Sequence, residues 1–202
     1  MFPRVSKYCR LFLATSLKVN SKPRRLPGFS LPEVIVSLSI IVMITAIFLS
    51  NYRDAEKRSD LSMSAQNLVS DIHLTQSYAL GLAEYAGEVP SGGWGLHFDS
   101  ATSSADRYII FADTNANQRY DVGEEDPNSG GRTIYFSKTT RIKGFTGVTS
   151  PLDITFLPPD PITTIYGGSG TSTVVDIILT EIVNNTEKSV QVNFLGLAEA
   201  LD

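Results

Sequence analysis

The first half of the chain carries two hydrophobic patterns in succession, and the first is an almost unbroken apolar run. Between Phe29 and Ser50 nearly every residue is apolar or small, and Glu33 is the only charged one. About 20 apolar residues suffice for a helix to cross the hydrocarbon core of a bilayer. The run therefore predicts a membrane-spanning helix over residues 29–50, with one acid close to its start.

The second pattern is periodic and begins at Leu61. Apolar or small residues recur there at intervals of four and three, which is the stripe of an amphipathic helix. No strong helix breaker stands before Gly81, so we expect one helix from about Leu31 to about Tyr85, roughly 80 Å long. Residues 51–86 would be its amphipathic continuation, packed on a folded domain. The stripe consists of Leu61, Ala65, Leu68, Ile72, Thr75, Ala79 and Leu82.

After this helix the pattern changes to short runs typical of β-strands, separated by clusters of Gly, Pro, Asn and Ser. We assign residues 87–202 to a β-rich globular domain and predict an α+β fold, in which a long N-terminal helix packs on an antiparallel sheet. The Pro- and Gly-rich segment 157–173 is interpreted as a connection. The predicted strands are Trp94–Phe98, Arg107–Ala112, Thr133–Phe136, Ile142–Phe145, Asp153–Leu157, Thr173–Leu179 and Ser189–Phe194.

Charge is distributed unevenly along the chain. Residues 1–28 hold seven bases and no acid, and the remainder holds 17 − 7 = 10 bases against 21 acids, a net charge of −11. A surface of that sign repels phosphate backbones, so nucleic acid is not an expected partner. The single cysteine, Cys9, lies in the basic leader, so the rest of the chain offers no disulfide or thiol chemistry.

The order of the segments also predicts topology. The basic cluster of residues 1–28 precedes the apolar run, and this places the N-terminus in the cytoplasm by the positive-inside rule. On this pattern alone an ordinary N-terminal signal anchor explains the chain equally well. Glu33 favours a more specific function, because an acid in an apolar helix costs about 2.5–3.5 kcal/mol on insertion scales and is usually functional.

The junction reads Gly28-Phe29-Ser30-Leu31-Pro32-Glu33, and it resembles the processing site of type IV prepilins and type II secretion pseudopilins. The resemblance implies that prepilin peptidase cuts after Gly28 and that the new N-terminus, Phe29, is methylated. It also implies that Glu33 neutralises the N-terminal amine of a neighbouring subunit as the helices stack. The family commonly has an aliphatic residue where Pro32 stands, but proline is tolerated in the first turn of a helix.

The same resemblance implies partners and a location. The expected partners are other pilin or pseudopilin subunits, prepilin peptidase, an inner-membrane assembly platform and membrane lipid. The chain would be a single-pass protein of a bacterial inner membrane, with a periplasmic or extracellular globular domain, that then enters a filament. The expected function is that of a structural subunit; the alternative is a minor tip subunit that binds a secreted substrate, a partner pilin or DNA.

Parts of the globular domain are similar to H-type pseudopilins and FimT-like minor pilins. In that family a late glycine, here Gly196, follows the last strand, and a basic residue often comes next. Leu197 stands at that position here, which argues against the DNA contact proposed for some members. The similar segments are GWGLHF, RYIIFADTNANQRYDVGEE, ITFLPPDP and VQVNFLGLAEAL.

One loop suggests a metal site. Between Asp113 and Glu124, oxygen-bearing side chains fall at places 1, 3, 5, 9 and 12 of a twelve-residue calcium loop, with a backbone carbonyl at place 7. Gln118 stands at place 6, where such loops have glycine, and the flanking segments are predicted strands. A hairpin loop whose Asp and Asn side chains bond their own backbone is the alternative. The possible calcium ligands are Asp113, Asn115, Asn117, Arg119 (carbonyl), Asp121 and Glu124.

We find no sequence pattern for catalysis and expect no enzymatic activity. No nucleophile motif, phosphate-binding glycine loop or His pair is evident. His97 alternates with the apolar Leu96 and Phe98, so we expect it to face solvent. The aromatic residues of the domain are interpreted as sheet core: Trp94, Tyr108, Phe111, Tyr135 and Phe136.

The processing hypothesis predicts the effect of one substitution. Gly28→Ala should stop cleavage, so full-length protein should accumulate in membranes in a host with prepilin peptidase. Gly87→Ala, a matched change outside the junction, should be processed normally. Immunoblotting separates the two sizes, and a mature-sized product from Gly28→Ala would show that the cleavage site is elsewhere.

Overall fold

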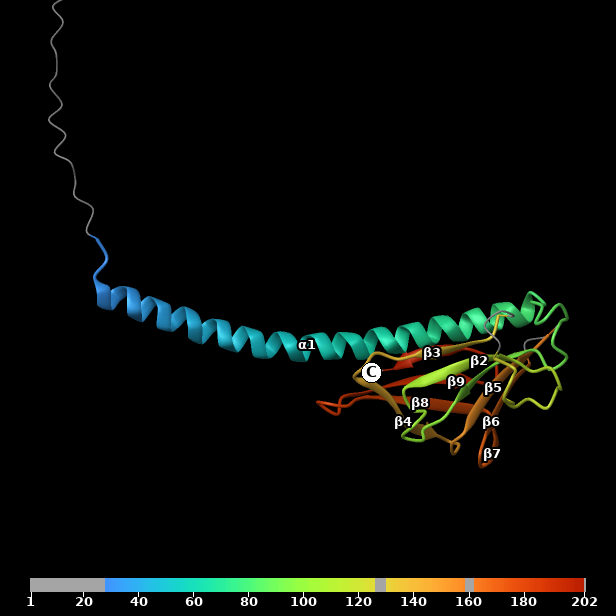
Figure 1. The fold of residues 1–202 in the computed structure, drawn as a ribbon. Coiled ribbons are helices and arrows are strands. Elements are labelled where there is room, and N and C mark those ends of the chain that lie inside the picture. Colours follow the sequence, from blue (N-terminus) through green and yellow to red (C-terminus); the bar gives the residue numbers. More distant parts are fainter. Residues whose placement is uncertain (1–27, 126–129, 159–161, 202) are drawn as a thin grey trace, which may run out of the picture. The chain divides into compact units, whose positions relative to one another are not determined.

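The computed structural model describes residues 28–125, 130–158 and 162–201 (Figure 1). The expected leader therefore lies outside the described residues, except for Gly28. The chain divides into two compact units, Met1–Ile44 and Thr45–Asp202. The apolar half of the helix belongs mainly to the first unit, and the folded domain forms the second.

Helix α1 spans Leu31–Leu80, so the predicted single helix is confirmed, but it ends five residues before Tyr85. The physical reason is a left-handed turn at Leu82, whose φ is 52°. The N–H of Ala83 donates to the carbonyl of Tyr78 at 2.9 Å, which is the closing bond of a Schellman motif. That bond satisfies one of the last helical carbonyls and turns the chain toward the sheets.

The described residues of the second unit form ten strands in two antiparallel sheets. Figure 1 shows most of these strands beside the second half of α1. The six-stranded sheet has the order β3-β2-β1-β5-β6-β7, and the four-stranded sheet has the order β10-β9-β8-β4. The strands are β1 (Trp94–Phe98), β2 (Arg107–Ala112), β3 (Arg132–Tyr135), β4 (Thr140–Thr146), β5 (Leu152–Leu157), β6 (Ile162–Gly167), β7 (Gly170–Ser172), β8 (Val174–Glu181), β9 (Glu187–Asn193) and β10 (Ala198–Leu201).

The predicted fold class, α+β with antiparallel pairing, is confirmed, but the prediction of a single sheet is wrong. Three strands were missed: β6 and β7, which lie in the segment interpreted as a connection, and β10. Gly168 and Ser169 turn the chain between β6 and β7, and Gly167 and Gly170 lie within the strands. β6 still has the β-branched content of a strand, ITTIYG.

One hydrophobic core joins the helix to both sheets. Six of the seven predicted stripe residues are at most 2% exposed, whereas Leu82, beyond the end of the helix, is 53% exposed. The stripe packs with inward residues of the six-stranded sheet, such as Phe98 and Ile154, and of the four-stranded sheet, such as Ile177. Among the aromatic residues expected in the core, the prediction for Tyr135 is wrong. This residue lies on edge strand β3 and is 62% exposed.

Polar contacts fix the helix on either flank. The Tyr108 hydroxyl on β2 donates to the Asp71 carboxylate at 2.5 Å, and burial together with this acceptor raises the pKa of Tyr108. Arg132 on β3 lies 3.8 Å from the other Asp71 oxygen. On the opposite flank the Gln76 amide donates to the carbonyl of Gly196, between β9 and β10. The helix is thus tied to both sheets at defined positions.

Gly196 is required by this second contact. The sequence led us to expect that Gly196 follows the last strand. This expectation is wrong, because β10 comes after this glycine. Its φ is +79°, and an added Cβ would lie 2.6 Å from the Gln76 amide nitrogen and 3.0 Å from the Thr163 hydroxyl. The positive φ therefore favours glycine, and an added Cβ would displace the end of the Gln76 side chain from its bond to the Gly196 carbonyl.

Gly196→Ala should consequently lower the free energy of unfolding more than a glycine substitution that meets only backbone strain. Gly87 is the matched control, since its φ is +89° and an added Cβ meets nothing within 4 Å. We expect about 1–2 kcal/mol for Gly87→Ala and at least about 1 kcal/mol more for Gly196→Ala. Urea unfolding of the full chain in detergent measures both, and equal losses would contradict the close contact with Gln76.

Candidate functional site

The first candidate site is the start of helix α1, where the sequence predicts processing and assembly. Gly28 and Phe29 precede the helix and are exposed, Phe29 by 80%. Glu33 is the third helical residue, and its carboxylate accepts the N–H of Ser30 at 3.4 Å, while its own N–H donates to the Ser30 carbonyl at 3.0 Å. This reciprocal contact is half of a capping box, and the Ser-x-x-Glu spacing signals it in the sequence.

The helix that follows is apolar on every side. Residues Leu31–Leu49 form a 19-residue segment with a mean hydropathy of 2.3, and none of it is buried within the chain. Its large side chains, such as Ile41 and Phe48, are 46–74% exposed. By length and composition this segment is able to cross a membrane. A helix that is hydrophobic all round needs apolar surroundings in place of water.

The second candidate site is the acidic loop, residues 113–124, which follows β2. Asp113 is fully buried, and its carboxylate accepts the N–H groups of Asn117 at 3.2 Å and Gln118 at 2.7 Å. Gly92 lies directly against it, because a Cβ there would be 2.0 Å from a carboxylate oxygen of Asp113. The first predicted ligand is therefore held rigidly at the base of the loop.

The other predicted ligands converge on the same loop. The side-chain amides of Asn115 and Asn117 both donate to one carboxylate oxygen of Asp121 at 2.7 Å. Glu124 is 5% exposed; it accepts the N–H of Thr114 at 2.9 Å and the N–H of Asp121 at 3.0 Å. The self-bonded loop expected as the alternative to a metal site is thus present, because the side-chain oxygens of these residues accept N–H groups of the loop itself.

At its sixth place the loop has the backbone conformation of a calcium loop, although the residue there is not glycine. Gln118, at the sixth place, has a φ of 60°, the left-handed conformation that glycine usually adopts. Within residues 28–125, 130–158 and 162–201, no group of three or more His, Cys, Asp or Glu side chains is arranged to hold a metal ion. A metal in this loop would therefore depend on the amide oxygens of Asn115 and Asn117.

The acidic loop also covers the outer face of the six-stranded sheet. The Tyr120 ring packs 4.6 Å from the His97 ring and 5.6 Å from the Phe111 ring. The Arg119 guanidinium lies 3.8 Å over the Tyr166 ring on β6. Burial, with a bond to Glu125, raises the pKa of Tyr120 to about 12. The phenol therefore stays protonated at neutral pH, and its packing is not opposed by a charge.

The expectation that His97 faces solvent is wrong. Its side chain is 18% exposed, and its Nδ1 lies 2.6 Å from the buried Asp153 carboxylate on β5. The reason is the return of the acidic loop, since Tyr120 covers the face to which the strand alternation assigns His97. In the described part of the chain, the hydrogen bonds of His97 include no hydroxyl or thiol. The pair fits a structural support for the loop.

Comparison with known proteins identifies no relative. No protein family matches the chain, and neither a curated protein nor a solved structure is significantly similar to it.

Removal of the Tyr120 ring tests the packing of the loop. Tyr120→Ala should lower the free energy of unfolding by roughly 1–3 kcal/mol, because contacts with two rings are lost. The amides of residues 114–121 should then exchange faster with deuterated water. Val122→Ala is the matched control, since Val122 is 92% exposed in the same loop. Hydrogen exchange measured by mass spectrometry compares them, and equal exchange in both variants would show that Tyr120 does not hold the loop.

Proposed function

We propose that the protein is a prepilin-like structural subunit. Prepilin peptidase cuts the chain after Gly28, Phe29 becomes the methylated N-terminus, and the helix from Leu31 packs against the helices of other subunits. The observation that carries the proposal is the combination found at the start of α1. A bilayer-length helix with its whole apolar surface exposed begins with a single acid, directly after a short exposed segment that contains the predicted cleavage site.

The energetics of Glu33 support assembly over simple anchoring. A carboxylate in an apolar environment costs about 2.5–3.5 kcal/mol on insertion scales. Among the described residues, the Glu33 carboxylate receives one long hydrogen bond, of 3.4 Å, from Ser30. That single bond satisfies only part of its capacity as an acceptor. The N-terminal ammonium of a neighbouring subunit would complete the pair, since two charges that are each costly in apolar surroundings stabilise one another.

The topology follows from the same proposal. The basic leader keeps the N-terminus in the cytoplasm of a bacterium, and the apolar helix crosses the inner membrane. The folded unit then lies on the periplasmic or extracellular side. No cysteine follows Cys9, so the folded unit has no thiol that this oxidising compartment could convert to a disulfide. The partners are other pilin or pseudopilin subunits, prepilin peptidase, the assembly platform and membrane lipid. The fold, one long helix on antiparallel sheets, is compatible with a pilin-like layout.

A narrower version of the function is a minor subunit at the filament tip whose folded unit binds a partner. The net charge of −11 after residue 28 disfavours DNA as that partner and favours a protein. No catalytic role is proposed for the folded unit.

We also propose calcium as a ligand of the acidic loop. The support is the left-handed φ of 60° at Gln118, which gives the loop the sharp turn of a calcium loop without glycine. Calcium prefers six to eight oxygen ligands, and carboxylates and amides at alternate positions suit it. The residues that would hold it are Asp113, Asn115, Asn117, Arg119 through its carbonyl, Asp121 and Glu124.

Glu33→Gln tests the assembly proposal, because it removes the charge while preserving the size of the side chain and an oxygen acceptor. The variant should insert into membranes normally but enter filaments at least about tenfold less, as expected for the loss of about 1.4 kcal/mol or more per contact. Ser37→Ala is the control one turn further along the helix. Quantifying the protein in sheared filaments against the membrane pool, in a host with the assembly machinery, gives the ratio. Normal incorporation of Glu33→Gln would contradict the pairing.

Calcium binding is tested on the full chain in detergent micelles. Calcium at about 100 times its Kd should stabilise the folded unit by about 2.7 kcal/mol, seen as a higher melting temperature. Asp121→Asn, which replaces one carboxylate ligand, should reduce the shift, whereas Val122→Ala should not. Absence of both a calorimetric heat and a melting shift at millimolar calcium would reject this proposal and leave the filament proposal untouched.

A further inference from the structure

Strand β3 ends the six-stranded sheet and presents an open edge. In an antiparallel pair, alternate residues direct their backbone groups toward the partner strand. The N–H of Phe136 donates to the carbonyl of Asp106 at 2.9 Å, next to β2, and this fixes the alternation. The backbone groups of Thr133 and Tyr135 therefore point away from β2. Within the described part of the chain, no hydrogen bond satisfies these outward groups.

A cleft of about 270 Å³ runs between this edge and helix α1. Its helical wall includes Asp60, Met63 and Asn67, which recur at the three- and four-residue spacing of one helical face. Its other wall includes Tyr135 and Ser137, in and directly after β3. Thus the helix and the second half of the edge strand line one space that no described segment fills, and the outward backbone of Thr133 continues this edge beyond the cleft. PDZ and PTB domains bind an extended peptide as an added strand at such an exposed sheet edge.

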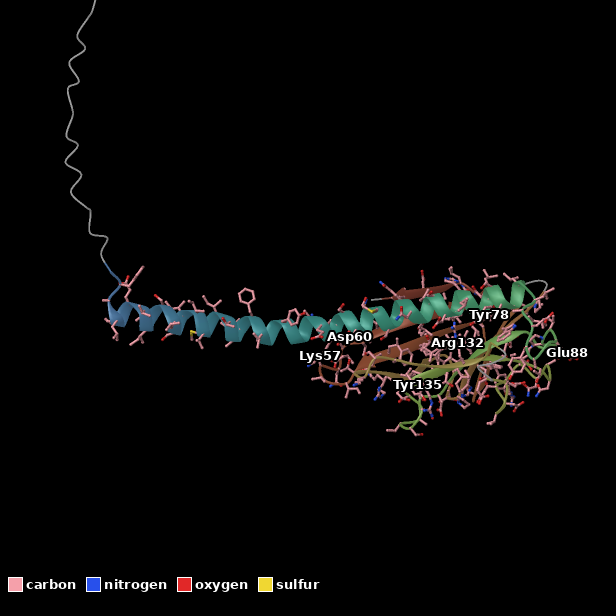
Figure 2. The ribbon with its side chains drawn as sticks, turned by 45° about the horizontal axis from the view of Figure 1, so that its top comes forward. Lys57, Asp60, Tyr78, Glu88, Arg132 and Tyr135 are labelled. Atoms are coloured by element: carbon pink, nitrogen blue, oxygen red, sulfur yellow. The ribbon has the colours of Figure 1, made fainter. Side chains whose placement is uncertain are left out.

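The walls of the cleft define the chemistry of an occupant. The Asp60 carboxylate has no ion pair with any other residue in the described ranges, whereas Asp71, which also lines the cleft, already binds Tyr108 and Arg132. Met63 contributes apolar surface and is 56% exposed. The Tyr135 ring lies on the other face of the sheet, under the Arg107 guanidinium at 5.8 Å, so β3 offers the cleft its backbone and not this ring. Figure 2 labels Asp60 on the helix and Tyr135 on the sheet side. A strand with one basic side chain among small or apolar residues matches this surface.

Of the three other sheet ends, β4 and β7 differ from β3 in ways that prevent strand addition, whereas β10 is a second four-residue edge without a bulge and does not line this cleft. Strand β4 is interrupted by a register shift at Lys143, and its Ile142 N–H is already bonded to the Ala105 carbonyl at 2.8 Å. A bulge and an edge lysine are devices by which proteins block edge pairing. Strand β7 is only three residues long. Strand β3 contains no lysine, proline or bulge.

We propose that the cleft between α1 and β3 binds an extended segment of a partner polypeptide as an added strand, with a Lys or Arg side chain of that segment against Asp60. The outward backbone groups of Thr133 and Tyr135 would pair with the segment. At about 3.3 Å per residue, the four residues of β3 accommodate a strand of about four residues, or roughly 13 Å. Backbone pairing supplies affinity for any extended chain, and Asp60 supplies the preference for a cation. This site would function equally in a monomeric anchored protein and in a filament subunit.

A synthetic peptide tests the cleft on the full chain in detergent micelles. The probe is a fluorescein-labelled, end-capped heptapeptide of alternating threonine and valine with one central lysine. Fluorescence anisotropy should show saturable, weak binding, and the same peptide with a central glutamate should bind at least about tenfold less tightly. Asp60→Asn should remove most of this lysine preference. Glu88→Gln, the same charge change at a distant position labelled in Figure 2, should preserve it.

The backbone contribution is tested separately. Thr133→Pro removes an outward N–H, and proline is tolerated on an edge strand at such a position. It should abolish peptide binding without a change in the urea midpoint of unfolding. A probe with N-methyl groups on alternate amides should likewise fail to bind, and it tests the same pairing without altering the protein.

Three results would overturn the proposal. One is the absence of saturable binding at millimolar peptide, and another is binding that neither Thr133→Pro nor N-methylation weakens. The third is self-association of the full chain that Thr133→Pro abolishes while the peptide does not compete. That result would assign the cleft to a second copy of the chain. None of these outcomes depends on Glu33 or on cleavage after Gly28.

Discussion

The apolar surface of residues 31–49 is the constraint on which the rest of this protein depends. None of that surface is buried within the chain, and exposed apolar area costs about 25 cal/mol per Å². Lipid or the helices of other subunits must therefore cover it. Glu33 restricts the choice further, because its carboxylate has one weak partner among the described residues and needs a cation once the helix is covered. A helix that packs against copies of itself satisfies both demands.

The same continuous helix also provides a wall of the folded unit. Its stripe from Leu61 to Ala79 closes a core shared by two sheets, and Asp71 and Gln76 fix its register on either flank. The acidic loop protects the opposite face of the six-stranded sheet through Tyr120. Between the helix and the six-stranded sheet, the described residues leave a cleft along β3, and the proposed peptide site lies there.

Patterns that depend on local sequence were predicted well, and features that depend on distant contacts were not. The bounds of β1 and β2 match the prediction, since alternation and flanking turns define them. Neither the partition into two sheets nor the burial of His97 has a local signal, because both result from segments that return from elsewhere. The cap that Ser30 and Glu33 form does have a local signal, the Ser-x-x-Glu spacing. The cap was not predicted, because Glu33 was interpreted only as an acid in an apolar helix.

The central claim is that the apolar helix is an assembly element with a processed N-terminus, and intact mass spectrometry tests it most directly. The protein would be extracted from membranes of a host that has prepilin peptidase and weighed without digestion. A mass corresponding to a chain that begins at Phe29 and carries one additional methyl group is the predicted result. A chain that retains Met1, or one cut at another position without methylation, would contradict the account and identify the helix as an ordinary membrane anchor.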